Sequence, residues 1–178
     1  MTINVSQVQR LLKSLGHSPG AIDGIWGSNS QKALDSACKE YGAVDPVDTT
    51  SDAEFWAGVR YFTREEFRCH CGGKYCNGFP VEPDRNLVRK LDELRAQVGA
   101  PIRISSGIRC AKHNANVEGS AKASQHMYGT AADLICSNLT PSQMLALAEK
   151  LLPGTGGLGL YSWGIHFDVR KSKARWKG

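Results

Sequence analysis

Two histidines and one aspartate have the residue types and the spacing of a metal site. His126 and Asp133 lie seven positions apart, and Gly129 and two alanines between them allow the chain to turn closely. His166 follows in a short apolar stretch typical of a strand. Two imidazole nitrogens and one carboxylate oxygen, with a fourth position open, form the ligand set of a catalytic zinc. Taken alone, the first pair is more simply read as a surface histidine and a capping aspartate.

The residues around this pair resemble a known family, the zinc D-Ala-D-Ala carboxypeptidases and L-alanyl-D-glutamate endopeptidases, which includes many phage endolysins. The resemblance spans about residues 60 to 178, and it implies that His126, Asp133 and His166 bind one zinc ion. It also implies that Arg109 stabilises the oxyanion or holds the substrate, the alternative being a structural ion pair with a carboxylate. The matching segments are 105–110 (SSGIRC), 113–114 (HN), 124–133 (SQHMYGTAAD), 157–161 (GLGLY) and 166–170 (HFDVR).

The general base departs from the pattern of that family. Many relatives have a carboxylate three residues before the last zinc-binding histidine, and this chain has Trp163 there. Either the base comes from elsewhere or activity is impaired. We place the base on Asp168, because His166 and Asp168 lie two apart on a predicted strand and therefore share a face; His113 is a further candidate. Alternatively, Asp168 orients a zinc ligand or pairs with Arg170.

The first 42 residues resemble the peptidoglycan-binding module of wall hydrolases, with two short apolar helices around a turn rich in glycine and proline. Residues 1–43 are therefore expected to bind peptidoglycan, with Asp23 and Trp26 contacting glycan or stem peptide. The alternative is that Asp23 caps a turn and Trp26 fills a small core. The matching segments are 8–12 (VQRLL), 15–16 (LG), 19–27 (PGAIDGIWG) and 33–34 (AL).

The rest of the pattern predicts an α+β catalytic domain at 53–178, behind a linker at 44–52 that has no periodicity. Thr63 and Glu66 form a capping box for a short helix. The apolar spacing predicts a helix at 84–98 that Gly99 ends, and a second helix that starts at Thr140 and Pro141. Short strands, expected to be antiparallel, are predicted near 102–104, 132–136, 157–161 and 165–170.

Six cysteines are more than a cytosolic protein of this size needs. Cys69, Cys71 and Cys76, together with His70, have the ligand types for a second, structural zinc site. The spacing is not that of a standard zinc finger, and we favour buried thiols or disulfides that involve Cys110 or Cys136. Sequence does not determine the pairing.

Net charge and composition limit the kinds of partner that the protein is expected to have. The net charge of +5 and pI of about 8.9 suit a polyanion such as a bacterial wall, but scattered basic residues do not favour nucleic acid. We see no secretory leader and no membrane-length apolar run. We therefore expect a monomer that is made in the cytoplasm without insertion into a membrane. It would act on the wall after release, in the host periplasm if the protein comes from a phage.

Three functions fit the sequence. The first is an endolysin-type zinc peptidase that cuts the peptide part of peptidoglycan. The second is a wall-binding protein without turnover, for which Trp163 is the supporting feature. The third is a cytoplasmic carboxypeptidase for free wall peptides, which would not need a wall-binding module. The sequence does not distinguish an L-Ala-D-Glu, a D-Ala-D-Ala or a cross-link bond as the target.

Overall fold

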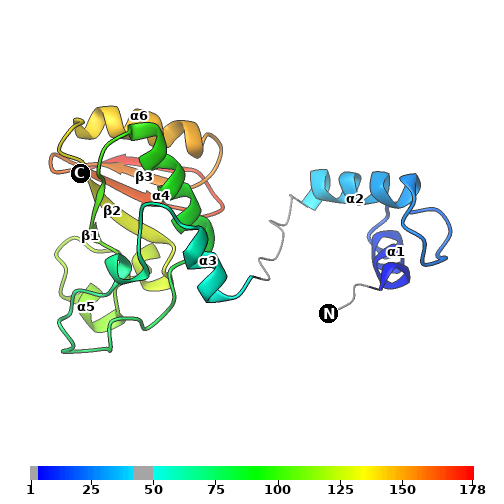
Figure 1. The fold of residues 1–178 in the computed structure, drawn as a ribbon, viewed down its shortest axis with the longest axis horizontal. Coiled ribbons are helices and arrows are strands. Elements are labelled where there is room, and N and C mark those ends of the chain that lie inside the picture. The colour runs from blue at the N-terminus through cyan, green and yellow to red at the C-terminus, as the bar shows by residue number, and fades with distance from the viewer. Residues whose placement is uncertain (1–3, 42–49) are drawn as a thin grey trace. The chain divides into compact units, whose positions relative to one another are not determined.

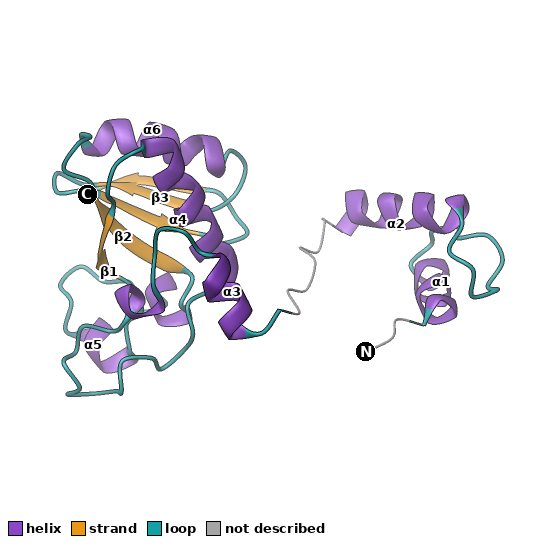
Figure 2. Ribbon diagram, in the orientation of Figure 1, coloured by secondary structure: helices purple, strands orange, loops and turns teal. Residues whose placement is uncertain are grey.

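The computed structural model describes residues 4–41 and 50–178. The chain divides into two compact units, Met1–Thr50 and Ser51–Gly178, which Figures 1 and 2 trace along the chain. Most of the predicted linker, 44–52, lies outside the described residues, and Asp52 already begins a helix. Among the described helices, none has the length and apolarity that a membrane crossing requires.

The N-terminal unit consists of helices α1 (Val5–Ser14) and α2 (Ser28–Tyr41) around a long turn. Asn4 caps α1 by accepting a hydrogen bond from the backbone N–H of Gln7. The two helices pack through Leu12, Ala33 and Ala37. The other apolar residues predicted on α1 are not all buried in this contact, since Leu11 is 57% exposed.

A buried glutamine organises the turn between these helices. Gln9 is 1% exposed, and its amide nitrogen donates to the Asp23 carboxylate at 3.1 Å and to the Ile25 carbonyl at 3.0 Å. Its side-chain oxygen accepts the backbone N–H of Gly24 at 3.0 Å. A polar side chain of helix α1 thus satisfies backbone groups of a loop that has little apolar core of its own.

We predict that Gln9→Ala destabilises the N-terminal unit by about 1–3 kcal/mol, because it removes the buried side chain whose hydrogen bonds hold the turn. Hydrogen exchange of the α1 and α2 amides measures the effect, with the amides of the second unit as an internal reference. Gln7→Ala is the matched control, since Gln7 is exposed on the same helix. Equal exchange rates in the two variants would show that Gln9 does not organise the turn.

The second unit begins with helices, continues with alternating strands and helices, and ends with three consecutive strands. Its helices are α3 (Asp52–Gly58), α4 (Arg85–Val98), α5 (Ala111–Ala115) and α6 (Pro141–Leu151), with 3-10 turns η1 (Arg64–Phe67) and η2 (Gln125–Tyr128). Its strands are β1 (Arg103–Ser106), β2 (Ala131–Ile135), β3 (Gly157–Leu160), β4 (Ile165–Asp168) and β5 (Ala174–Lys177).

Local signals place most of these elements where the sequence predicts them. The capping box of Thr63 and Glu66 starts η1, Asp84 caps α4, and Gly99 ends α4 in the left-handed conformation. Thr140 caps α6. Helices α3 and α5 and strand β5 were not predicted.

The five strands form one sheet in the order β1-β2-β4-β3-β5, which confirms the α+β fold. The pairs β1–β2, β2–β4 and β3–β4 are antiparallel. Strand β5 pairs in parallel with β3. The four strands that the sequence predicts are antiparallel as expected, and the unpredicted strand β5 makes the sheet mixed.

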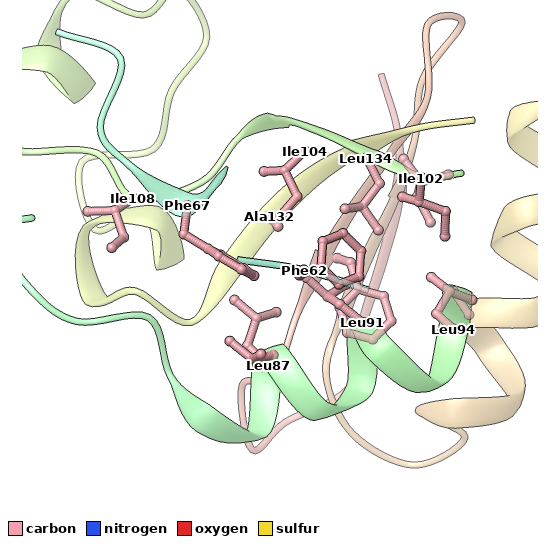
Figure 3. Close-up of a cluster of buried hydrophobic side chains, with 14 of the residues drawn as sticks. Phe62, Phe67, Leu87, Leu91, Leu94, Ile102, Ile104, Ile108, Ala132 and Leu134 are labelled. Carbon is pink, nitrogen blue, oxygen red and sulfur yellow. The ribbon is translucent and has the colours of Figure 1, made fainter. Parts of the chain in front are cut away.

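One face of the sheet is apolar and is covered by helices. Helix α4 packs on α6, and α6 packs on β3 and β4. Figure 3 shows Leu87 and Leu91 of α4 pointing toward the strands, which contribute Ile104 and Leu134. Because side chains alternate along a strand, the residues between these apolar positions point to the opposite face.

Candidate active site

Strand pairing brings two of the predicted metal ligands together. Asp133 of β2 and His166 of β4 are direct cross-strand partners in an antiparallel pair, and such partners project from the same face at a short distance. Their neighbours Leu134, Ile165 and Phe167 belong to the core on the other face. The alternation that buries the core thus presents both polar side chains on the opposite side of the sheet.

The third ligand comes from the turn that leads into β2. His126 lies in η2, and Gly129 ends this turn with φ 71° in the left-handed region, which glycine adopts without strain. The Nδ1 atom of His126 lies 2.6 Å from the carbonyl oxygen of Gly107. His126 is 2% exposed, so it is not the surface histidine of the simpler alternative, and Asp133 lies in a strand rather than at a helix cap.

The three ligand atoms surround one point. The Nδ1 atom of His166 lies 2.9 Å from Oδ1 of Asp133 and 3.2 Å from Nε2 of His126. The remaining pair, Nε2 of His126 and Oδ1 of Asp133, lies 3.2 Å apart. Ligands about 2.0–2.1 Å from a tetrahedral metal lie about 3.3 Å from each other. The geometry therefore fits a small divalent cation.

The hydrogen bonds on the outer sides of the rings also fit a cation. His126 donates from Nδ1 to a carbonyl, so its Nε2 faces the other ligands with a lone pair. His166 bonds through Nε2 to the Asp168 carboxylate at 3.0 Å, which leaves Nδ1 toward Asp133. A single proton between His166 and Asp133 would still leave the lone pair of His126 without a donor. A cation at the common point satisfies all three atoms.

The surroundings keep the carboxylates charged. Burial opposes ionisation of Asp133, but hydrogen bonds from His126 and His166 outweigh it and hold its pKa well below the usual range. Burial lowers the pKa of His126. For His166, the hydrogen bonds to Asp133 and Asp168 outweigh burial, and the pKa is raised. A charged Asp133 and a neutral His126 are the forms that bind a metal, whereas His166 must release a proton for its Nδ1 to do so.

The surroundings of Asp168 favour the alternative role that the sequence left open over that of the general base. Its carboxylate is fully buried, lies 3.0 Å from Nε2 of His166, and pairs with Arg170 at 2.5 Å. It also accepts the backbone N–H of Gly157 at 2.9 Å. The ring of His166 thus separates Asp168 from the point where the ligands converge. The geometry matches the alternative in which Asp168 orients a ligand and pairs with Arg170.

We therefore predict that Asp168→Asn weakens metal binding by about 10–100-fold, the usual effect of losing a partner of a ligating histidine. The metal affinity is measured by competition with a chelator, and activity should return when excess zinc is added. Arg175 makes a comparable ion pair with Glu149 away from the site, so Glu149→Gln is the matched control. A large loss of rate with unchanged zinc affinity would instead support Asp168 as the base.

Arg109 makes the structural ion pair that the sequence left open. Its Nη2 donates to Oδ2 of Asp133 at 2.5 Å, and its Nε donates to Oγ of Ser106 at 2.8 Å. Because Oδ2 is held by Arg109, Oδ1 of Asp133 is turned toward the two histidines. Arg109 also lines the cleft, so its predicted contact with the substrate stays a prediction.

A cleft of about 420 Å³ opens over the three ligand residues. One wall is aromatic, because Trp163 is 45% exposed and its ring stacks on Tyr161 with centroids 4.9 Å apart. The loop at 117–121 forms another part of the wall and includes Glu118. Sequence reasoning overlooked Glu118, which lies in a polar segment without periodicity. His113 is directed elsewhere, with Nδ1 3.3 Å from the sulfur of Cys69.

The two predicted wall-binding residues differ in their surroundings. Asp23 accepts hydrogen bonds from Gln9 at 3.1 Å and from the backbone N–H of Ile25 at 2.9 Å, which is the turn-capping alternative. Trp26 is 39% exposed, and its indole N–H donates to Gln31 at 3.0 Å. It does not fill a core, and its exposed face stays available to a ligand.

Two imidazoles and a carboxylate at an open cleft on an α+β domain form a set that can hold a metal ion with a position open to substrate. The model of the family described as Peptidase M15 matches residues 60–168, which is more than half of the chain. This protein therefore belongs to the peptidase M15 family and is a metallopeptidase, and M15 peptidases are zinc enzymes. No curated protein matches the chain.

Proposed function

We propose that this chain is an endolysin-like peptidoglycan hydrolase that cleaves an amide bond of the wall peptide, with one zinc ion held by His126, Asp133 and His166. The observation that carries the proposal is the convergence of three ligand atoms, 2.9–3.2 Å apart, at a cleft. Membership of the M15 family supports a substrate related to peptidoglycan.

The bound zinc would polarise the scissile carbonyl and lower the pKa of the attacking water. Arg109 fixes the orientation of Asp133 and lies in the same cleft, where its guanidinium stabilises negative charge on the substrate oxygen. Asp168 orients the ring of His166 through its hydrogen bond with Nε2, the nitrogen on the far side of the ring from Asp133. The stacked rings of Tyr161 and Trp163 orient the substrate along one wall.

We assign the general base to Glu118. Within the described residues that line the cleft, the carboxylates are those of Glu118 and Asp133, and Asp133 is committed to Arg109 and the histidines. Glu118 is exposed, so its carboxylate is accessible to water. It would take the proton of the attacking water and return it to the leaving amine, the task that a carboxylate at position 163 has in many relatives.

Digestion of purified peptidoglycan, followed by mass analysis of the released fragments, tests the function and identifies the bond. We expect soluble peptide fragments with one new amine terminus and one new carboxylate terminus. His166→Ala protein is the negative control. If active-site integrity is shown by zinc content and no fragment appears, the hydrolase proposal is wrong.

The second candidate is a wall-binding protein without turnover, and Trp163 in the place of a carboxylate favours it. Such a protein would sediment with peptidoglycan and release no fragments. Trp163→Glu distinguishes the two functions: gain of hydrolysis from an inactive parent would support the binder, while an active parent excludes it.

We also propose that the N-terminal unit binds peptidoglycan on its own. The support is its compactness as a separate unit and the exposed ring of Trp26. We predict that a fragment of residues 1–50 sediments with purified sacculi and that Trp26→Ala weakens this sedimentation. Removing the unit should slow lysis of whole walls more than cleavage of small soluble fragments, because only a bound wall gains from raised local concentration. A fragment that stays in the supernatant, while the full chain sediments, contradicts the proposal.

A further inference from the structure

Four cysteines outside the cleft converge on a second point. Cys69, Cys71 and Cys76 lie in the loop between η1 and α4, and Cys110 precedes α5. Their four sulfur atoms all lie within 4.8 Å of one another. We propose that these four thiolates bind one zinc ion with a structural role, in addition to the zinc of the active site.

The distances between the sulfur atoms are those of a metal site rather than of disulfides. The sulfurs of Cys71 and Cys76 lie 3.5 Å apart, whereas sulfurs about 2.3 Å from a tetrahedral zinc lie about 3.8 Å apart and a disulfide bond is about 2.05 Å long. All six cysteines, each in the described part of the chain, are free. Of the two outcomes that the sequence favoured, buried thiols or disulfides, the structure has free thiols.

Backbone N–H groups point at three of the four sulfurs. Cys69 accepts from the N–H of Cys110 at 3.3 Å, Cys76 from Gly78 at 3.4 Å, and Cys110 from His113 at 3.4 Å. Such donors stabilise sulfur as the thiolate, which is the form that binds a metal. The imidazole of His113, 3.3 Å from the sulfur of Cys69, adds a donor of the kind that orients metal ligands.

The local chain is built to bring the sulfurs together. After Cys71, Gly72 and Gly73 take left-handed conformations with φ 63° and 82°, so the chain reverses before it reaches Cys76. The N–H of Cys69 then bonds to the carbonyl of Gly78 at 2.8 Å and closes the loop. Four thiolates leave no position open for substrate, which distinguishes this closed site from the catalytic one.

The segment 69–79 explains why such a site would be useful. It contains neither helix nor strand, and its buried side chain is that of Cys69. A loop with so little apolar burial gains its order from a metal, since a structural zinc contributes directly to folding. Cys110 directly follows Arg109. The second zinc would therefore also hold the backbone that positions the guanidinium on Asp133.

Zinc content of the full-length protein, purified without oxygen, tests this proposal. We expect two zinc ions per chain in the unchanged protein, one in His166→Ala and one in Cys71→Ser. Cys136→Ser is the matched control with two ions, because Cys136 is a buried free cysteine outside the cluster. One zinc in the unchanged protein, lost in His166→Ala, would overturn the second site and leave the proposed function intact.

A second measurement needs no variant and so does not depend on whether Cys71→Ser folds. Replacing zinc by cobalt in the unchanged protein should give the intense near-ultraviolet bands of thiolate-to-cobalt charge transfer. The two-histidine, one-carboxylate site has no sulfur and cannot produce them. Absence of these bands at full cobalt loading, or a mass that shows two disulfides in the anaerobic protein, would refute the four-thiolate site.

Discussion

His126→Ala should lose the catalytic zinc and reduce peptidoglycan hydrolysis by about 1000-fold or more. Lewis-acid catalysis by a bound metal contributes several kcal/mol, and about 1.4 kcal/mol corresponds to a factor of ten in rate. His126 supplies one of three converging atoms and is 2% exposed. Its replacement by alanine therefore removes a ligand and opens a small void beside the other two.

Elemental analysis and release of soluble peptides measure the two effects on the same preparation. Tyr128→Ala is the matched control, because Tyr128 lies in the same turn as His126 but is 56% exposed. If the four-cysteine site binds zinc as proposed, His126→Ala should still contain one zinc ion per chain. Metal content equal to that of the unchanged protein would show that His126 is not a ligand, whatever happens to the rate.

The convergence of the three predicted ligand residues could be expected from the sequence, because the residue types and the strand pattern agree. His166 lies between Ile165 and Phe167, and Asp133 lies between Ala132 and Leu134. In a strand, this alternation directs the polar side chain away from the core. The register that places Asp133 opposite His166 is a tertiary property, and no local signal in either segment specifies it.

The role of Asp168 shows where sequence reasoning reaches its limit. Spacing alone places Asp168 on the same face as His166, which is correct. The same spacing serves a base and a positioning residue equally well. The distinction depends on which nitrogen of His166 faces the other two ligand residues. Arg170 and the N–H of Gly157, from another strand, hold the Asp168 carboxylate in the position where it bonds to the opposite nitrogen.

The missed elements lack the signals by which such elements are recognised. Helix α5 has five residues and is capped by the sulfur of Cys110, which is not one of the usual capping side chains. Strand β5, with the sequence ARWK, alternates apolar and polar residues over only four positions, which is too short a signal to separate it from a loop, and it is stabilised by pairing with β3. The cysteine site joins three neighbours to Cys110, which lies 34 residues beyond Cys76, and only the fold brings them together.

Glu118→Gln should reduce the turnover rate by about 100-fold or more while the zinc content stays unchanged. A positioned general base contributes about 100–10,000-fold, and the amide keeps the size of the side chain but removes its basic oxygen. Glu118 makes no contact with the three ligands among the interactions described for the chain, so the metal should be unaffected. The expected change lies in kcat rather than in KM, since proton transfer belongs to the chemical step.

Asp168→Asn is the matched comparison for Glu118→Gln. Both variants replace a carboxylate by an amide, but only Asp168 is buried against a ligand of the metal. Added zinc should restore much of the activity of Asp168→Asn and none of that of Glu118→Gln. The pH profile gives a further criterion: if Glu118 is the base, its variant loses the acidic limb of the kcat profile, because that limb reports protonation of the base. A Glu118→Gln enzyme with nearly full rate would exclude Glu118. The base would then have to be a residue that does not line the cleft, or the chain would be a wall-binding protein without turnover.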